Sequence, residues 1–122
     1  MADEITMQFQ VQLVNGTLRD SYSGTNLGAD QSSAALVRNV QTILHTGHSA
    51  LELGGVSTPG WAVFINLSDT DYVEIGIDVG ATFYPFLKLD AEEEMLCHLG
   101  ISAPYAQADT ASVDLYYIIY DS

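Results

Sequence analysis

The sequence predicts an all-β protein: one β-sandwich domain over residues 1–122, with the jelly roll of about eight strands as the preferred architecture. Apolar and polar residues alternate in several short segments, which is the period of a strand with one solvated face. Gly, Asn, Asp and Pro recur between these segments as turn signals. No segment shows a clear helical period, and the length suits a single domain.

The stretch from Tyr72 to Leu89 is the centre of this prediction. Apolar residues alternate with Glu, Gly and Asp over residues 73–79, which indicates a strand. Turn chemistry follows at Asp78–Ala81, and residues 83–89 indicate a second strand that returns beside the first. We therefore expect a β-hairpin here, with the other strands arranged around it.

The N-terminal segment, residues 5–13, alternates strictly and predicts a half-buried strand that ends at Asn15-Gly16. The apolar residues of its inner face are Ile5, Met7, Phe9, Val11 and Leu13. Residues 17–33 are small and polar, which favours a long surface loop. An arm that reaches a neighbouring subunit is an equal alternative for that stretch.

Further strands are expected at residues 35–44, 49–53, 61–67, 95–99 and 112–120, with a loop over residues 100–110. Residues 35–44 have mixed periodicity, and their β-branched side chains favour a strand over a helix. In the strand at 61–67 the expected inner face is Trp61, Val63, Ile65 and Leu67. In the last strand it is Val113, Leu115, Tyr117 and Ile119.

Two of these strands are apolar on both faces. The last strand carries Tyr116, Ile118 and Tyr120 opposite its core-facing set, and the strand from Phe83 carries Tyr84 and Phe86. A sandwich strand needs only one apolar face, and tyrosine is enriched in protein interfaces. We expect these five residues to contact another subunit or partner. The alternative is that loops of the same chain cover them.

Charge limits the partners. Sixteen acidic residues against Arg19, Arg38 and Lys88 give a formal net charge of −13. Binding to nucleic acid or to anionic lipid is not expected, because both depend on clustered Lys and Arg. No apolar run is long enough to span a bilayer, and the N-terminus lacks the pattern of a secretion signal, which predicts synthesis in a cytoplasm. The single cysteine, Cys97, is expected to be a small core residue.

No set of residues predicts a reaction. His45 and His48 lie three apart across an expected turn, with His98 elsewhere, so we expect no catalytic metal. Asp69, Asp71 and Asp78 could supply oxygen ligands to calcium, but their spacing matches no EF-hand loop. The acidic run at residues 90–94 is expected to be a solvated corner, with docking to a basic patch as the alternative. We expect no enzyme, no catalytic residues and no cofactor.

Two neighbouring stretches, WAVFINLSD at residues 61–69 and DYVEIGIDVGATFYPFLKLDAEE at residues 71–93, resemble small structural proteins of tailed bacteriophages. The shared pattern is an Asn-Leu strand end, a Val-Glu-Ile-Gly strand, a Gly-centred turn and Phe-x-Pro-Phe-x-x-Leu. It covers about a third of the chain. Residues 90–92 are Asp-Ala-Glu where the family pattern has a Pro-Gly corner.

The resemblance implies a non-enzymatic virion protein: a capsid decoration (cement) protein that bridges and stabilises coat subunits on the outer shell. It implies a homotrimer that binds the major capsid protein, located on the capsid surface and made in the cytoplasm of a bacterial host. The alternative is a tail, neck or baseplate component, or a glycan-binding jelly roll. Its candidate sugar-stacking aromatics are Tyr22, Tyr105 and Trp61, although Trp61 is expected to fill the core.

Overall fold

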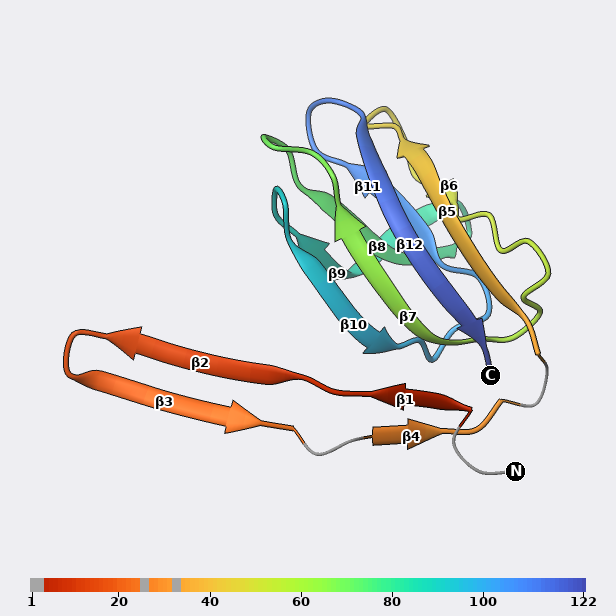
Figure 1. Ribbon diagram of the computed structural model, residues 1–122. Helices are drawn as coiled ribbons and strands as arrows, with labels where there is room; N and C mark the ends of the chain where they lie inside the picture. The colour runs from red at the N-terminus through yellow and green to blue at the C-terminus, as the bar shows by residue number, and fades with distance from the viewer. Residues whose placement is uncertain (1–3, 25–26, 32–33) are drawn as a thin grey trace. The chain divides into compact units, whose positions relative to one another are not determined.

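The computed structural model describes residues 4–24, 27–31 and 34–122 (Figure 1). These residues form twelve strands and no helix, which confirms the all-β prediction. The chain divides into two compact units, Met1–Ser32 and Ser33–Ser122. The expectation of one domain over residues 1–122 stays a prediction.

The first unit is built from two antiparallel strand pairs. The first pair is β1 (Ile5–Met7) with β4 (Leu27–Ala29), and the second is β2 (Gln10–Asn15) with β3 (Leu18–Ser23). Gly16, with a φ of 61°, forms the turn between β2 and β3 in a backbone conformation that favours glycine.

Two predictions for this unit are wrong. The expected strand over residues 5–13 is interrupted after Met7. Phe9, Val11 and Leu13 are exposed, because the described residues of this unit form no second layer over them. The expected loop over residues 17–33 contains β3 and β4, since Asn15-Gly16 reverses the chain instead of ending the pairing. Residues 25–26 and 32–33 of that loop lie outside the described residues.

The second unit contains two four-stranded antiparallel sheets that pack in a sandwich-like arrangement (Figure 1). The strand orders are β10-β7-β12-β5 in one sheet, called sheet I here, and β6-β11-β8-β9 in the other, called sheet II. In chain order the strands are β5 (Leu36–Ile43), β6 (Ser49–Ala50), β7 (Pro59–Asn66), β8 (Val73–Val79), β9 (Thr82–Leu89), β10 (Glu94–His98), β11 (Tyr105–Ala108) and β12 (Val113–Asp121).

The core of this unit is apolar and draws on both sheets. Its largest fully buried side chains are Tyr117, Phe64, Ile43, Ile75, Leu89, Leu115, Ile119 and Val73. The four expected core residues of the last strand are all buried, which confirms its predicted orientation. Cys97 is half-buried and packs against this core, and burial raises the pKa of its thiol.

The predicted hairpin is confirmed as β8 and β9. Gly80 and Ala81 form its turn, both with positive φ, and this turn geometry matches the twist of the paired strands. The pairing shifts by one residue between Ile75 and Gly76, which leaves Phe86 as the additional residue of a β-bulge.

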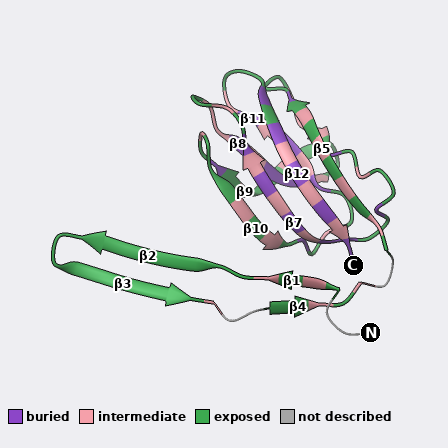
Figure 2. Cartoon of the chain, viewed as in Figure 1, coloured by how far each residue is buried: buried purple, intermediate pink, exposed green. Residues whose placement is uncertain are grey.

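The predicted orientation of β7 is wrong. Ala62, Phe64 and Asn66 are buried, whereas Trp61, Val63 and Ile65 are half-exposed on the opposite face, as the alternating colours of β7 show in Figure 2. Leu67, expected on the inner face, lies beyond the strand and is exposed. Both faces of this strand are apolar, so the hydrophobic pattern could not decide between them.

The loop predicted over residues 100–110 contains a strand. Tyr105–Ala108 forms β11, which pairs with β6 and with β8. Two of its four residues are alanines, which are weak strand formers. Ala106 and Ala108 are buried against the core, so tertiary packing makes this segment a strand.

Candidate interaction surface

The face of sheet I opposite the core, which we call the outer face, is an apolar surface formed by all four strands. Directly opposed residues of an antiparallel pair share a face of the sheet. One row across the sheet is Leu96, Val63, Ile118 and Arg38, and the next is Glu94, Ile65, Tyr116 and Val40. At the end of β12, Tyr120 lies opposite Leu36 of β5. On the same face, Trp61 of β7 lies opposite His98 of β10.

The centre of this face is apolar, and its two edge strands carry both apolar and polar residues. The two central strands contribute Trp61, Val63, Ile65, Tyr116, Ile118 and Tyr120, all partly buried and partly exposed. On the edge strand β5, Leu36 and Val40 are 51% and 50% exposed. Glu94 and His98 on β10 and Arg38 on β5 are exposed polar residues at the two edges. An apolar centre within a polar rim is typical of protein interfaces.

Contacts within the face fix several of these side chains. Arg38 Nη1 donates a hydrogen bond to Tyr116 Oη at 3.0 Å, and Thr42 Oγ1 donates to Asp114 Oδ1 at 2.8 Å. The rings of Trp61 and His98 stack at 4.8 Å. Aromatic and arginine side chains held in this way lose little conformational freedom when a partner binds.

The structure brings together three of the five predicted interface residues. Tyr116, Ile118 and Tyr120 lie on the outer face of sheet I. Tyr84 and Phe86 are 53% and 52% exposed, but they lie on β9 in sheet II. They therefore belong to a different part of the surface.

The predicted interface set lacks most of the other apolar residues of this face. The sequence pattern predicts Trp61, Val63 and Ile65 in the core, and it does not distinguish Leu36, Val40 and Leu96 as contact residues. The available signal was the doubly apolar pattern of β7, the same pattern that singled out the last strand.

On the other side of the sandwich, His48 and Asp78 form a polar pair among aromatic rings. His48 Nε2 lies 2.7 Å from Asp78 Oδ2, and the imidazole stacks on Phe83 and meets the edge of Tyr105. The hydrogen bond with His48 and that from the Ala81 N–H hold the pKa of Asp78 below its ordinary value. The pair ties the loop before β6 to the β8–β9 hairpin.

The predicted metal candidates are not brought together. Among the residues that the structure describes, no group of three His, Cys, Asp or Glu side chains could hold a metal ion. Asp71 accepts hydrogen bonds from Thr70 and Thr110, whereas Asp78 is paired with His48.

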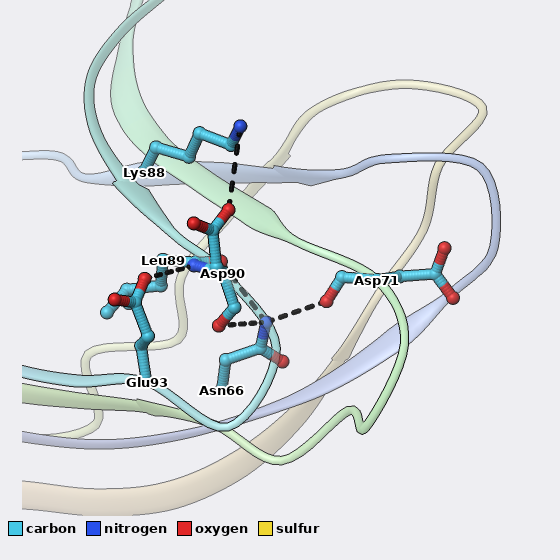
Figure 3. A network of polar contacts seen from close by, with 6 residues as sticks. All are labelled: Asn66, Asp71, Lys88, Leu89, Asp90 and Glu93. Atoms are coloured by element: carbon cyan, nitrogen blue, oxygen red, sulfur yellow. Dashed lines mark hydrogen bonds and ion pairs between the residues drawn. The ribbon is translucent and has the colours of Figure 1, made fainter.

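Asn66 is a buried polar residue that joins three segments (Figure 3). Its Nδ2 group donates to the carbonyl oxygens of Asp71 at 2.8 Å, Asp90 at 3.1 Å and Leu89 at 3.2 Å. Its Oδ1 accepts the Ser68 N–H at 3.0 Å. The Asn-Leu end of β7 therefore has a structural role, because it connects sheet I to the end of β9 in sheet II.

The acidic corner after β9 is stabilised by its own residues. Glu93 Oε1 accepts the Asp90 N–H at 2.6 Å, and Lys88 Nζ lies 3.5 Å from Asp90 Oδ1. Glu92 has a φ of 63°, so the turn forms without the Pro-Gly pair of the family pattern.

Two of the three aromatic residues proposed for glycan binding lie in different sheets, Trp61 on β7 in sheet I and Tyr105 on β11 in sheet II. Tyr22 belongs to the first unit. Trp61 is half-exposed, so the expectation that it fills the core is wrong.

The described part of the chain contains no helix long and apolar enough to cross a membrane.

Comparison with protein-family models, with curated proteins and with solved structures finds no match to this chain in any of the three.

Proposed function

We propose that the second unit is a jelly roll. Its eight strands pair as four nested antiparallel pairs, β8 with β9, β7 with β10, β6 with β11 and β5 with β12. This is the pairing of one long hairpin whose turn is the β8–β9 turn, wrapped so that its strands fall into two sheets. Jelly rolls of this kind occur in viral capsid proteins, lectins and cupins, so the fold alone selects no function.

We propose that the protein is a structural component of a tailed-phage virion, specifically a decoration (cement) protein that bridges coat subunits on the outside of the capsid. The observation that supports this proposal most is the outer face of sheet I. It presents Trp61, Tyr116, Tyr120 and Arg38 together, and these residue types contribute most of the binding energy at interfaces. A face of this composition suits a protein partner better than a small substrate.

Charge supports the same proposal. Residues 33–122 carry twelve of the sixteen acidic residues but only Arg38 and Lys88 as cations. An exterior of this charge favours a partner with a basic patch and disfavours DNA. In a shell, weak contacts repeated over many copies give high total avidity, so each single contact need not be strong.

The test is immunogold electron microscopy of the phage particles whose genome encodes this chain. Gold over the head supports the decoration role. Gold confined to the tail, neck or baseplate would favour the alternative virion role. Particles that carry no label, although the protein is expressed in the same lysate, would contradict a virion protein of either kind.

A further inference from the structure

The first unit contains an amphipathic ribbon, residues 5–24 and 27–29, which we call the arm. On one side of the β2–β3 hairpin lie the opposed pairs Val11 and Tyr22, Leu13 and Asp20, and Asn15 and Leu18. Phe9 extends this side, since its ring lies 5.7 Å from that of Tyr22. The other side is polar except for Val14, and its members are Gln10, Gln12, Arg19, Ser21 and Ser23.

Among the described residues of the first unit, no layer covers the apolar side of the arm. Phe9, Val11, Leu13, Leu18 and Tyr22 are between 43% and 59% exposed. A hairpin of two strands is at best marginally stable in water without a surface to pack on. A regular alternation of this kind therefore indicates a ribbon that becomes ordered against another surface.

Charge indicates which surface that is. Between residues 5 and 29 the only charged residues are Arg19 and Asp20, so the arm is electrically neutral in a chain of net charge −13. Two acidic sandwiches repel each other when their bodies meet, whereas a neutral ribbon can contact an acidic body without that cost. The arm has too few cations to select DNA or anionic lipid.

We propose that the arm of one copy packs, through its apolar side, on the outer face of sheet I of a second copy. The contact would bury the apolar side of the arm against the apolar centre of the outer face, both of which are accessible within the described part of their own units. It is a head-to-tail contact, and such contacts close into rings when the rotation permits, as in the expected trimer. This inference extends the proposed function. It rests on that function in one respect, namely that the outer face is a surface for assembly.

The test is cysteine cross-linking between two co-expressed chains, both carrying Cys97→Ala. One chain carries Val11→Cys on the apolar side of the arm, and the other carries Val63→Cys at the centre of the outer face. We expect a disulfide-linked heterodimer under mild oxidation. Two matched controls, Gln12→Cys on the polar side of the arm and Gln107→Cys on sheet II, should each lower its yield at least about tenfold.

Three results would overturn the inference. A disulfide that forms only when both cysteines are in one chain would place the arm on its own sandwich. A disulfide that forms only between two Val11→Cys chains would place arm against arm. No disulfide in any combination, in a protein with a native circular dichroism spectrum, would leave the arm without a partner in this assembly.

A second variant pair separates this inference from the proposed function. Val11→Asp with Leu13→Asp adds two charges to the apolar side of the arm, and Gln10→Asp with Gln12→Asp adds the same charge to its polar side. We expect only the first pair to raise the dissociation constant of self-association, by at least about tenfold. Equal effects would contradict the arm contact, whereas the virion role depends on the particle labelling alone.

Discussion

At the scale of single residues, the buried amide of Asn66 stabilises the fold through its hydrogen bonds to neighbouring backbone segments. It is 1% exposed, and its amide serves three carbonyl groups and one N–H from the segments around it. A buried amide satisfied in this way specifies one arrangement of the chain, because any other arrangement leaves buried polar groups without partners.

We expect Asn66→Asp to lower the free energy of unfolding by about 3 kcal/mol or more at neutral pH, since a carboxylate cannot donate to carbonyl oxygens and would be buried among them. Burial raises the folded-state pKa of a carboxyl group, so the loss should shrink as pH falls and the group becomes protonated. Urea denaturation of both proteins across pH measures this. A loss that does not change with pH would contradict the role assigned to the amide.

Gly76 is required by the bulge between β8 and β9. A Cβ atom there would collide with the backbone carbonyl oxygen of Tyr84 and lie 2.6 Å from Pro85 Cα. We expect Gly76→Ala to cost about 2–3 kcal/mol of unfolding free energy, because backbone atoms cannot move aside as a flexible side chain does. Gly55→Ala, where a Cβ meets nothing within 4 Å, is the control. Similar losses in both variants would show that the bulge tolerates a side chain.

The His48–Asp78 pair predicts a dependence of stability on pH. The folded-state pKa of Asp78 is lowered, so its contribution is fully present above the pKa of an ordinary aspartate, about 4, and is lost as pH falls through the lower folded value. The stability difference between wild type and Asp78→Asn should therefore be retained above about pH 4 and diminish as pH falls below it. A difference that grows in acid would have the wrong sign for this pair.

At the scale of elements, the sequence predicted best where pattern and turn chemistry agreed. The β8–β9 hairpin was predictable because alternation, Asp78 and Gly80 all indicated the same structure. The face of β7 was not, because Trp61 and Phe64 compete for the core and only tertiary packing decides between them. The role of Asn66 depends on Leu89 and Asp90, which lie 23 and 24 residues further along the chain. The role of Gly76 depends on the bulge that brings Tyr84 and Pro85 against it, which the alternation of the two strands does not reveal.

The first unit shows a second limit of prediction from the sequence pattern. Its alternation correctly indicates a strand, but alternation cannot say whether the apolar side is covered by the same chain or by another molecule. Asn15-Gly16 is a signal for a hairpin turn as well as for the end of a strand. As a hairpin turn it predicts a returning strand, which is β3.

Strand β12 allows a direct test of the two faces of sheet I with neighbouring residues. Tyr117 is buried, and its hydroxyl donates to the Glu52 carbonyl at 2.7 Å, so Tyr117→Asp should cost about 4 kcal/mol or more of unfolding free energy. Tyr116 is half-exposed, so Tyr116→Asp should cost about 1 kcal/mol or less while weakening self-association. Thermal unfolding and sedimentation separate the two effects. Equal losses of stability would show that the outer face belongs to the core of the fold.

At the scale of the whole molecule, the chain combines a strongly acidic exterior with an apolar sheet face and a neutral arm. Their contributions to self-association depend differently on salt concentration. Repulsion between copies of charge −13 weakens as salt screens it, while burial of apolar surface persists. Association through the outer face should therefore strengthen with salt, whereas a contact between acidic and basic patches would weaken.

Sedimentation equilibrium of the isolated 122-residue chain, from about 0.05 to about 0.5 M salt, tests the central claim that the outer face is an assembly surface. We predict a mass near three times that of the 13.2 kDa chain, with tighter association at higher salt and a lower mass for Tyr116→Asp. A wild-type protein that stays monomeric at every salt concentration, with a Tyr116→Asp variant of the same mass, would contradict it.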